Sequence, residues 1–106
     1  MEAISAKDAA ELLRDEPEET ILLDVREVAE LAIASIPGAL HIPMREIPAR
    51  LGELDPNKII ICLCHMGGRS AQVTAFLNSR GHSRAVNLNG GITAWARDVD
   101  PEIPIY

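Results

Sequence analysis

One thiol stands in a glycine-rich loop whose composition suits anion chemistry. The loop reads Cys64-His65-Met66-Gly67-Gly68-Arg69-Ser70; it follows an apolar run over 58–63 and precedes an amphipathic helical pattern over 71–80. The backbone N–H groups of such a strand-to-helix loop have no partners of their own, and together they favour an anion. Because the thiolate is the nucleophilic form of cysteine, the loop predicts that Cys64 ionises readily and acts in nucleophilic sulfur chemistry.

Two glycines give the loop the freedom that such a site needs. Gly67 and Gly68 allow the backbone to curl with positive φ, so that successive N–H groups converge on the sulfur of Cys64. A cradle of this kind stabilises a thiolate and equally a persulfide anion on the same side chain.

The charged residues near the loop have alternative interpretations. Arg69 either faces the sulfur site or pairs with a carboxylate such as Asp24 or Glu30. Asp24 and Arg26 carry opposite charges two residues apart after a strand. We interpret this pair as fixing a loop rather than as catalytic.

The remaining polar residues of this region are less specific. His65 is either a proton donor at the mouth of the loop or an exposed loop side chain. Ser70 is predicted as the N-cap of the following helix, and Cys62 as a core residue rather than a resolving thiol. Cys62, Cys64 and His65 are too crowded for a tetrahedral zinc site, so no metal is expected.

The elements that must position this loop follow an α/β pattern, in which short apolar runs alternate with helical patterns around a mostly parallel sheet. Helices are predicted over 5–14, 28–34, 45–51, 71–80 and 92–97, strands over 21–24, 39–42, 58–63 and 85–88, and an extended tail over 98–106. Ligands of open α/β sheets bind at the carboxyl ends of the strands. Segments 24–27 and 89–91 are therefore expected to line one crevice with the Cys64 loop.

Length and composition exclude several classes of protein. The 106 residues predict one domain, 1–106, and 47% hydrophobic residues are enough for its core. A net charge of −6 with scattered basic residues and three aromatics argues against nucleic acid or an anionic membrane as partner. No signal peptide or membrane span is predicted, and two cysteines two residues apart suit reduced thiols and a cytoplasmic location.

Four stretches in order carry a resemblance to a known family. They are Leu22-Leu23-Asp24-Val25-Arg26-Glu27; Ile36-Pro37-Gly38-Ala39 with Ile42-Pro43; Cys64 with Gly67, Arg69 and Ser70; and Asn87-Leu88-Asn89-Gly90-Gly91 with Trp95. On these residues the chain resembles a single-domain rhodanese over almost its whole length. The resemblance implies a five-stranded parallel sheet flanked by helices on both faces.

The resemblance also implies an activity, that of a thiosulfate sulfurtransferase. Cys64 would be the catalytic, persulfide-forming nucleophile, and His65, Met66, Gly67, Gly68 and Arg69 would form the substrate-binding loop. A sulfane sulfur would pass from thiosulfate or a persulfide to a thiophilic acceptor such as cyanide or a thiol, with no cofactor. The implied partners are these small molecules or a sulfur-relay protein, and the chain is expected to be a monomer or weak dimer.

Departures from the family pattern keep other functions open. Ala34-Ser35 stands where the family usually has Gly-His, and His65 and Met66 stand where thiosulfate enzymes carry cations. Weak thiosulfate binding, with a persulfide or protein donor instead, is one consequence. The alternative function is a persulfide carrier or interaction module that relays sulfur without efficient small-molecule turnover. Phosphatase loops need five residues between Cys and Arg, and only four separate Cys64 from Arg69.

Overall fold

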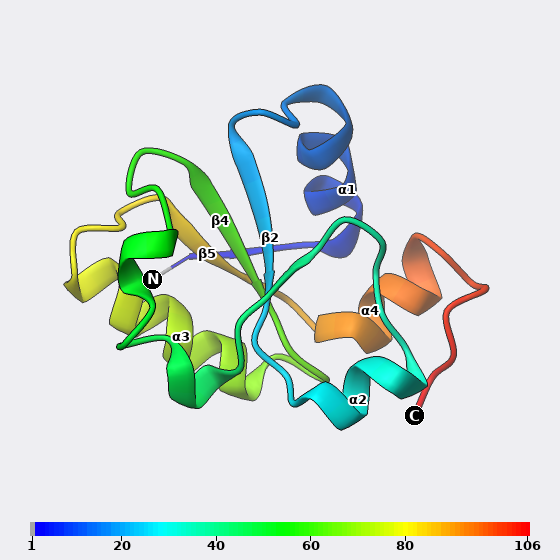
Figure 1. Ribbon diagram of the computed structural model, residues 1–106. Coiled ribbons are helices and arrows are strands. Elements are labelled where there is room, and N and C mark those ends of the chain that lie inside the picture. The colour runs from blue at the N-terminus through cyan, green and yellow to red at the C-terminus, as the bar shows by residue number, and fades with distance from the viewer. Residues whose placement is uncertain (1) are drawn as a thin grey trace.

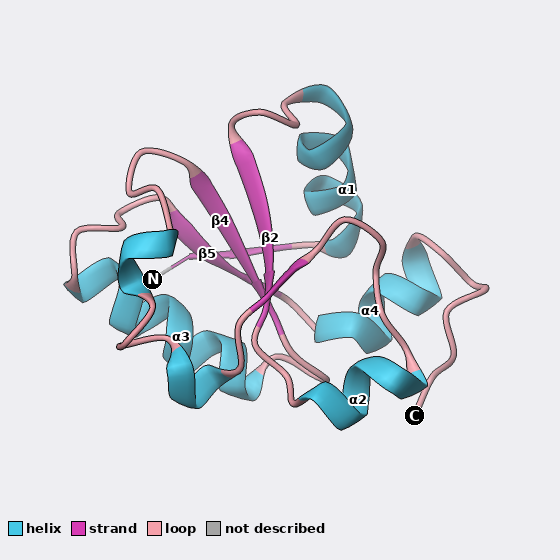
Figure 2. Ribbon diagram, in the orientation of Figure 1, coloured by secondary structure: helices cyan, strands magenta, loops and turns pink. Residues whose placement is uncertain are grey.

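Five parallel strands form one sheet in the computed structural model, which describes residues 2–106. The strands are β1 (Glu2–Ile4), β2 (Thr20–Asp24), β3 (Leu40–His41), β4 (Ile59–Leu63) and β5 (Ala85–Leu88), in the spatial order β1-β5-β4-β2-β3 (Figure 2). The central strand β4 is apolar throughout because helices cover both faces of a parallel sheet. Cys64 follows β4 directly, so its thiol lies at the carboxyl end of the central strand.

Three of the four helices found in residues 2–106 pack on the faces of the sheet and form its two cores, and the second helix along the chain contributes no buried residue. The four helices are α1 (Ala6–Asp15), α2 (Val28–Ile33), α3 (Gly68–Ser79) and α4 (Gly91–Asp98). Helices α1 and α4 lie on one side of the strands and α3 on the other (Figure 1). Alternate residues of β4 enter opposite cores: Ile61 packs with the α1 and α4 side chains, and Cys62 with those of α3. The predicted rhodanese-like sheet with helices on both faces is confirmed.

Several element boundaries differ from the prediction. Strand β1 was not predicted; its three residues pair with β5. The helix expected over 45–51 is instead two 3₁₀ turns, Met44–Glu46 and Leu51–Glu53, separated by a segment that contains Pro48. Proline has no N–H to donate to a continuing helix. Within residues 2–106, no helix combines the length and the apolar composition that crossing a membrane requires.

Candidate functional site

The sulfur of Cys64 sits at the base of its loop, where it accepts one backbone hydrogen bond and lies beside one hydroxyl whose single proton is shared with Asn87 Oδ1. The N–H of Gly67 donates to Sγ at 3.1 Å, and the Ser70 hydroxyl oxygen lies 3.2 Å from Sγ. Gly67 adopts φ = +111°, in the region that favours glycine, whereas Gly68 is already helical. Only one of the two glycines therefore supplies the predicted positive φ.

Ser70 contributes to the sulfur site rather than capping the helix, which corrects the sequence-based assignment. Helix α3 begins at Gly68, with Gly67 as its N-cap, because the positive φ of Gly67 turns the chain into the helix early. Ser70 is consequently buried inside the first turn, with its hydroxyl between Cys64 Sγ and Asn87 Oδ1, 2.5 Å away. Asn87 also donates from Nδ2 to the carbonyl of Gly67 at 3.2 Å, so β5 holds both the loop and the hydroxyl in place.

Segment 89–91 reaches the loop as expected. The N–H of Ile92 donates to the carbonyl of Cys64 at 2.9 Å, and that of Thr93 to the carbonyl of His65 at 3.3 Å. Gly91 has φ = +58°, and a Cβ at this position would clash with both of these carbonyls. The start of α4 can approach the loop this closely only because Gly91 has no side chain.

Arg69 pairs with a carboxylate rather than facing the sulfur. Its guanidinium donates to both carboxylate oxygens of Glu30 on α2, at 2.6 and 2.9 Å. The hydrogen bonds from Arg69 hold the pKa of the Glu30 carboxyl at about 2, well below its usual value. Of the two alternatives left open by the sequence, the structure shows the ion pair with Glu30.

Tyr106 closes over the loop and was not among the predicted site residues. Its ring stacks on His65, with centroids 3.9 Å apart and planes 5° apart, and its main-chain oxygen accepts from His65 Nε2 at 2.5 Å. Its hydroxyl accepts from Arg26 at 2.8 Å and donates to Glu30 at 2.7 Å. The only sequence signal was a tyrosine in a proline-containing tail, which gives no indication of where it docks.

Asp24 and Arg26 form a buried ion pair, which is the contact expected of a pair that fixes a loop. Both side chains are buried, and Arg26 donates to both carboxylate oxygens, with a shortest distance of 2.7 Å. Arg26 also donates to the carbonyl of Ala34 at 2.8 Å. This pair anchors the loop after β2. Arg26 also donates to the hydroxyl of Tyr106, whose ring stacks on His65 of the Cys64 loop.

The two cysteines are buried in the same core, at 0% and 1% exposed, and differ in the polar groups beside their sulfur atoms. Burial raises the pKa of the Cys62 thiol to about 12. Its side chain packs in the core on the α3 face, as predicted, while both thiols are free. Met66, two residues after Cys64 in the loop, is 67% exposed.

Comparison with known proteins places the chain in a family. A model of the family described as "Rhodanese-like domain" matches residues 5–98. The chain belongs to the rhodanese-like domain family. A sulfurtransferase of Allochromatium vinosum is 40% identical over 94 residues, covering 89% of this chain and 87% of the relative.

Two further relatives differ in how much of their own length this chain covers. A rhodanese-like domain protein from Staphylococcus aureus shares the fold with a TM-score of 0.83 and 35% identity, covering 100% of this chain and 99% of the other. The putative sulfur carrier protein YrkF of Bacillus subtilis is 37% identical over 81 residues, covering 76% of this chain but only 44% of YrkF. The rhodanese-like domain thus occurs both nearly alone and as part of longer proteins.

Proposed function

We propose that this chain is a sulfurtransferase that carries a sulfane sulfur as a persulfide on Cys64. The observation that supports it most directly is the Gly67 N–H that donates to Cys64 Sγ, with the Ser70 hydroxyl 3.2 Å away and free to turn its proton from Asn87 Oδ1 to an anionic sulfur. Donors fixed around an anion stabilise it without reorganising during the reaction. Similarity to the Allochromatium vinosum sulfurtransferase supports the same reaction class.

The transfer proceeds in two displacements through a covalent intermediate. The Cys64 thiolate attacks the outer sulfur of thiosulfate; a new S–S bond forms, the S–S bond of the donor breaks, and sulfite leaves with the bonding electron pair. Cyanide then attacks the terminal sulfur of the persulfide, thiocyanate leaves, and the thiolate is regenerated. Two half-reactions that share one intermediate give ping-pong kinetics.

The loop favours a persulfide donor over thiosulfate. Thiosulfate carries two negative charges, and the two basic side chains of the loop are already engaged: Arg69 with Glu30 and His65 with Tyr106. Met66 is exposed in the same loop, where a cation would attract the dianion. The reacting sulfur of a persulfide carries a single negative charge, so binding it requires less positive charge in the loop. We therefore assign a persulfide as the preferred donor.

Thiocyanate formation from thiosulfate and cyanide tests the proposal. The wild-type chain and Cys62→Ala should both form thiocyanate, and Cys64→Ala should form none. After incubation with donor alone, intact-mass analysis should show one added sulfur atom, located on Cys64. Turnover by Cys64→Ala, or sulfur found on Cys62, would refute the assignment.

A charge substitution tests the donor preference. Met66→Lys should lower KM for thiosulfate by about tenfold, because it adds one cation near the approach of a dianion, and should change KM far less for the persulfide of N-acetylcysteine amide, which carries a single negative charge. Met66→Gln is the neutral control. Equal effects on both donors would contradict the charge argument.

The second candidate function is a persulfide carrier, supported by the similarity to the putative sulfur carrier YrkF. A carrier would accept sulfur from a persulfide on a partner protein, such as a cysteine desulfurase, yet release little thiocyanate with any small donor. The two free thiols fit a reducing compartment, and we propose a cytoplasmic location for either function.

A further inference from the structure

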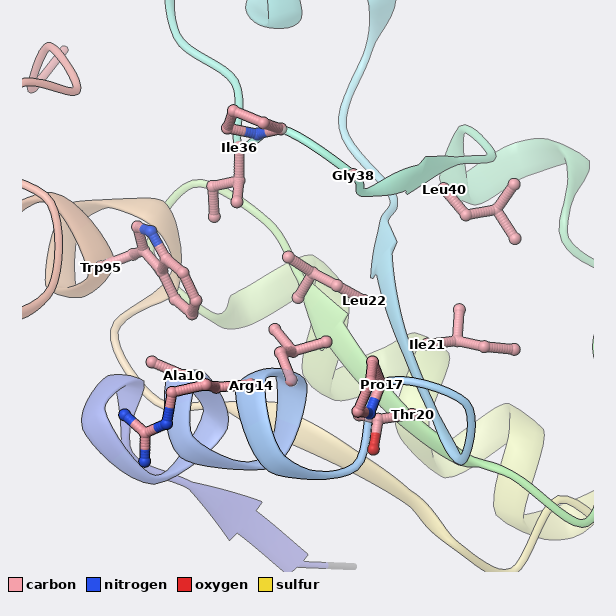
Figure 3. Close-up of a pocket in the computed structure, with 12 residues that line it drawn as sticks. Ala10, Arg14, Pro17, Thr20, Ile21, Leu22, Ile36, Gly38, Leu40 and Trp95 are labelled. Carbon is pink, nitrogen blue, oxygen red and sulfur yellow. The ribbon is translucent and has the colours of Figure 1, made fainter.

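A second concave site lies away from Cys64, along an edge of β2. It is a pocket of about 630 Å³ between α1, β2, the 36–40 loop and α4. Figure 3 shows Trp95, Ile36 and Leu22 on one side of β2, and Ile21 and Leu40 on the other. Its volume falls in the range of ligand sites. None of the residues that surround Cys64 Sγ lines it.

The pocket follows a stretch of β2 that has no neighbouring strand on one side. Strand β2 pairs with β4 along its whole length, from Thr20 to Asp24. On the other side β3 pairs only with Leu23 and Asp24. Residues 20–22 are therefore an open strand edge, which is a template for pairing with another chain.

The direction of the backbone groups can be followed from the adjoining hydrogen bonds. The carbonyl of Glu19 accepts from Ile59, and the N–H of Val25 donates to Leu63, so odd-numbered residues of this segment face β4. In a parallel ladder the alternate residues face the other neighbour. The N–H of Leu22 and both backbone groups of Thr20 consequently point to the open edge, while the C=O of Leu22 belongs to the short pairing with β3.

The side chains around this edge suit a strand rather than a compact molecule. Leu22 belongs to the core under α1 and α4, whereas Ile21 and Leu40 pack against the core under α3, so the pocket is apolar on both faces of the sheet. An added strand sends alternate side chains to opposite faces and would fill both halves. Thr20 also lines the pocket; it is only 7% exposed, and its hydroxyl has no hydrogen-bond partner among residues 2–106.

Charge at the mouth of the pocket narrows the choice of occupant. The segment Asp15-Glu16-Pro17-Glu18-Glu19 is exposed and carries four carboxylates, and its Pro17 lines the pocket. The four carboxylates lie outside the pocket; its one charged lining residue within 2–106, Arg14, donates to the neighbouring Asp15, and Arg84 approaches Glu19 at 4.0 Å. Two cations for four carboxylates leave this rim negative, and it would attract a cationic segment.

We propose that the open edge of β2 binds an extended peptide segment of a partner protein as an added strand. The segment has apolar side chains at its centre and Lys or Arg residues at its ends. Main-chain hydrogen bonds to Thr20 and Leu22 supply affinity, and the pockets on both faces select the side chains. This site works independently of sulfur transfer at Cys64.

The binding test uses the blocked peptide Lys-Lys-Val-Thr-Val-Leu-Val-Lys-Lys and the full chain. Trp95 is the one tryptophan of the sequence and lines the pocket, so its fluorescence reports occupancy. Binding should be saturable and should slow hydrogen exchange at the amides of Thr20 and Leu22. N-methylation of alternate peptide residues should weaken binding about tenfold or more, because it removes the main-chain donors. Replacing the four lysines with glutamate should weaken it similarly.

Matched variants on α1 locate the site. Ala10 lines the pocket, so Ala10→Phe should fill it and weaken binding, whereas Lys7→Phe, at an exposed position of the same helix, should not. Cys64→Ala should bind the peptide as well as the wild type does, which separates this test from the proposed sulfur transfer. The proposal is overturned if the peptide leaves Trp95 fluorescence unchanged, if N-methylated peptide binds equally well, or if the two amides stay unprotected.

Discussion

At the scale of single residues, the two thiols should differ sharply in reactivity. Both thiols are buried, but Cys62, with a pKa of about 12, stays protonated at pH 8, whereas Cys64 Sγ accepts a hydrogen bond from the Gly67 N–H and lies beside the Ser70 hydroxyl. Iodoacetamide at pH 8 should therefore modify one cysteine per chain, and peptide mapping should place the label on Cys64. Ser70→Ala removes the hydroxyl whose proton can turn from Asn87 Oδ1 to the reacting sulfur, and it should slow this labelling about fivefold. Equal labelling of both cysteines would contradict the argument.

The hydroxyl of Thr20 is buried and has no hydrogen-bond partner among residues 2–106. Thr20→Val replaces the unpartnered Oγ1 with a methyl group of similar size and should raise the free energy of unfolding by about 1 kcal/mol. Thr74→Val is the matched control, because the Thr74 hydroxyl is buried but donates to the carbonyl of Ser70 at 2.8 Å. That variant should be less stable than the wild type by about 1 kcal/mol. Urea denaturation measures both, and a destabilised Thr20→Val would be the contrary result.

At the scale of elements, the tail that ends in Tyr106 holds the Cys64 loop from outside. Tyr106→Phe keeps the stack on His65 but loses the hydroxyl that joins Arg26 to Glu30. We expect faster hydrogen exchange at the amides of residues 65–68 and a loss of about 1–2 kcal/mol of stability. The control is Ile105→Ala, since Ile105 is 65% exposed and should leave that exchange unchanged. Unaltered exchange in Tyr106→Phe would show that the tail does not brace the loop.

The same element shows what the sequence could predict and what it could not. The strand, loop and helix around Cys64 are signalled locally by an apolar run, two glycines and a helical pattern, and the structure contains all three. The contact of Arg26 with Tyr106 joins residues 80 apart, and β1 owes its assignment to pairing with β5, so neither has a local signal. Ser70 was assigned wrongly because a serine at a helix start usually caps it. The positive φ of Gly67 instead begins α3 earlier and turns Ser70 toward the sulfur.

At the scale of the whole molecule, one carboxylate joins three segments that are distant in the sequence. Glu30 on α2 accepts from Arg69 on α3 and from Tyr106 in the tail. Its pKa is about 2 in the folded chain, below the ordinary value of 4.5, chiefly because of the hydrogen bonds from Arg69. As the pH falls, the unfolded chain therefore takes up this proton first. The stabilisation from Glu30 is fully present above pH 4.5 and is lost progressively toward pH 2.

Glu30→Gln should consequently change the pH dependence of stability as well as its value. At pH 7 the variant should be less stable than the wild type, because Arg69 and Tyr106 lose a charged partner. Between pH 5 and pH 2 its stability should fall less steeply, since this carboxylate no longer takes up a proton. The control is Glu53→Gln, which breaks an ion pair with Arg50 at an exposed position and should alter the curve little. Denaturant unfolding at several pH values gives both curves. Parallel curves for wild type and Glu30→Gln would show that the junction of α2, α3 and the tail does not depend on the charge of Glu30.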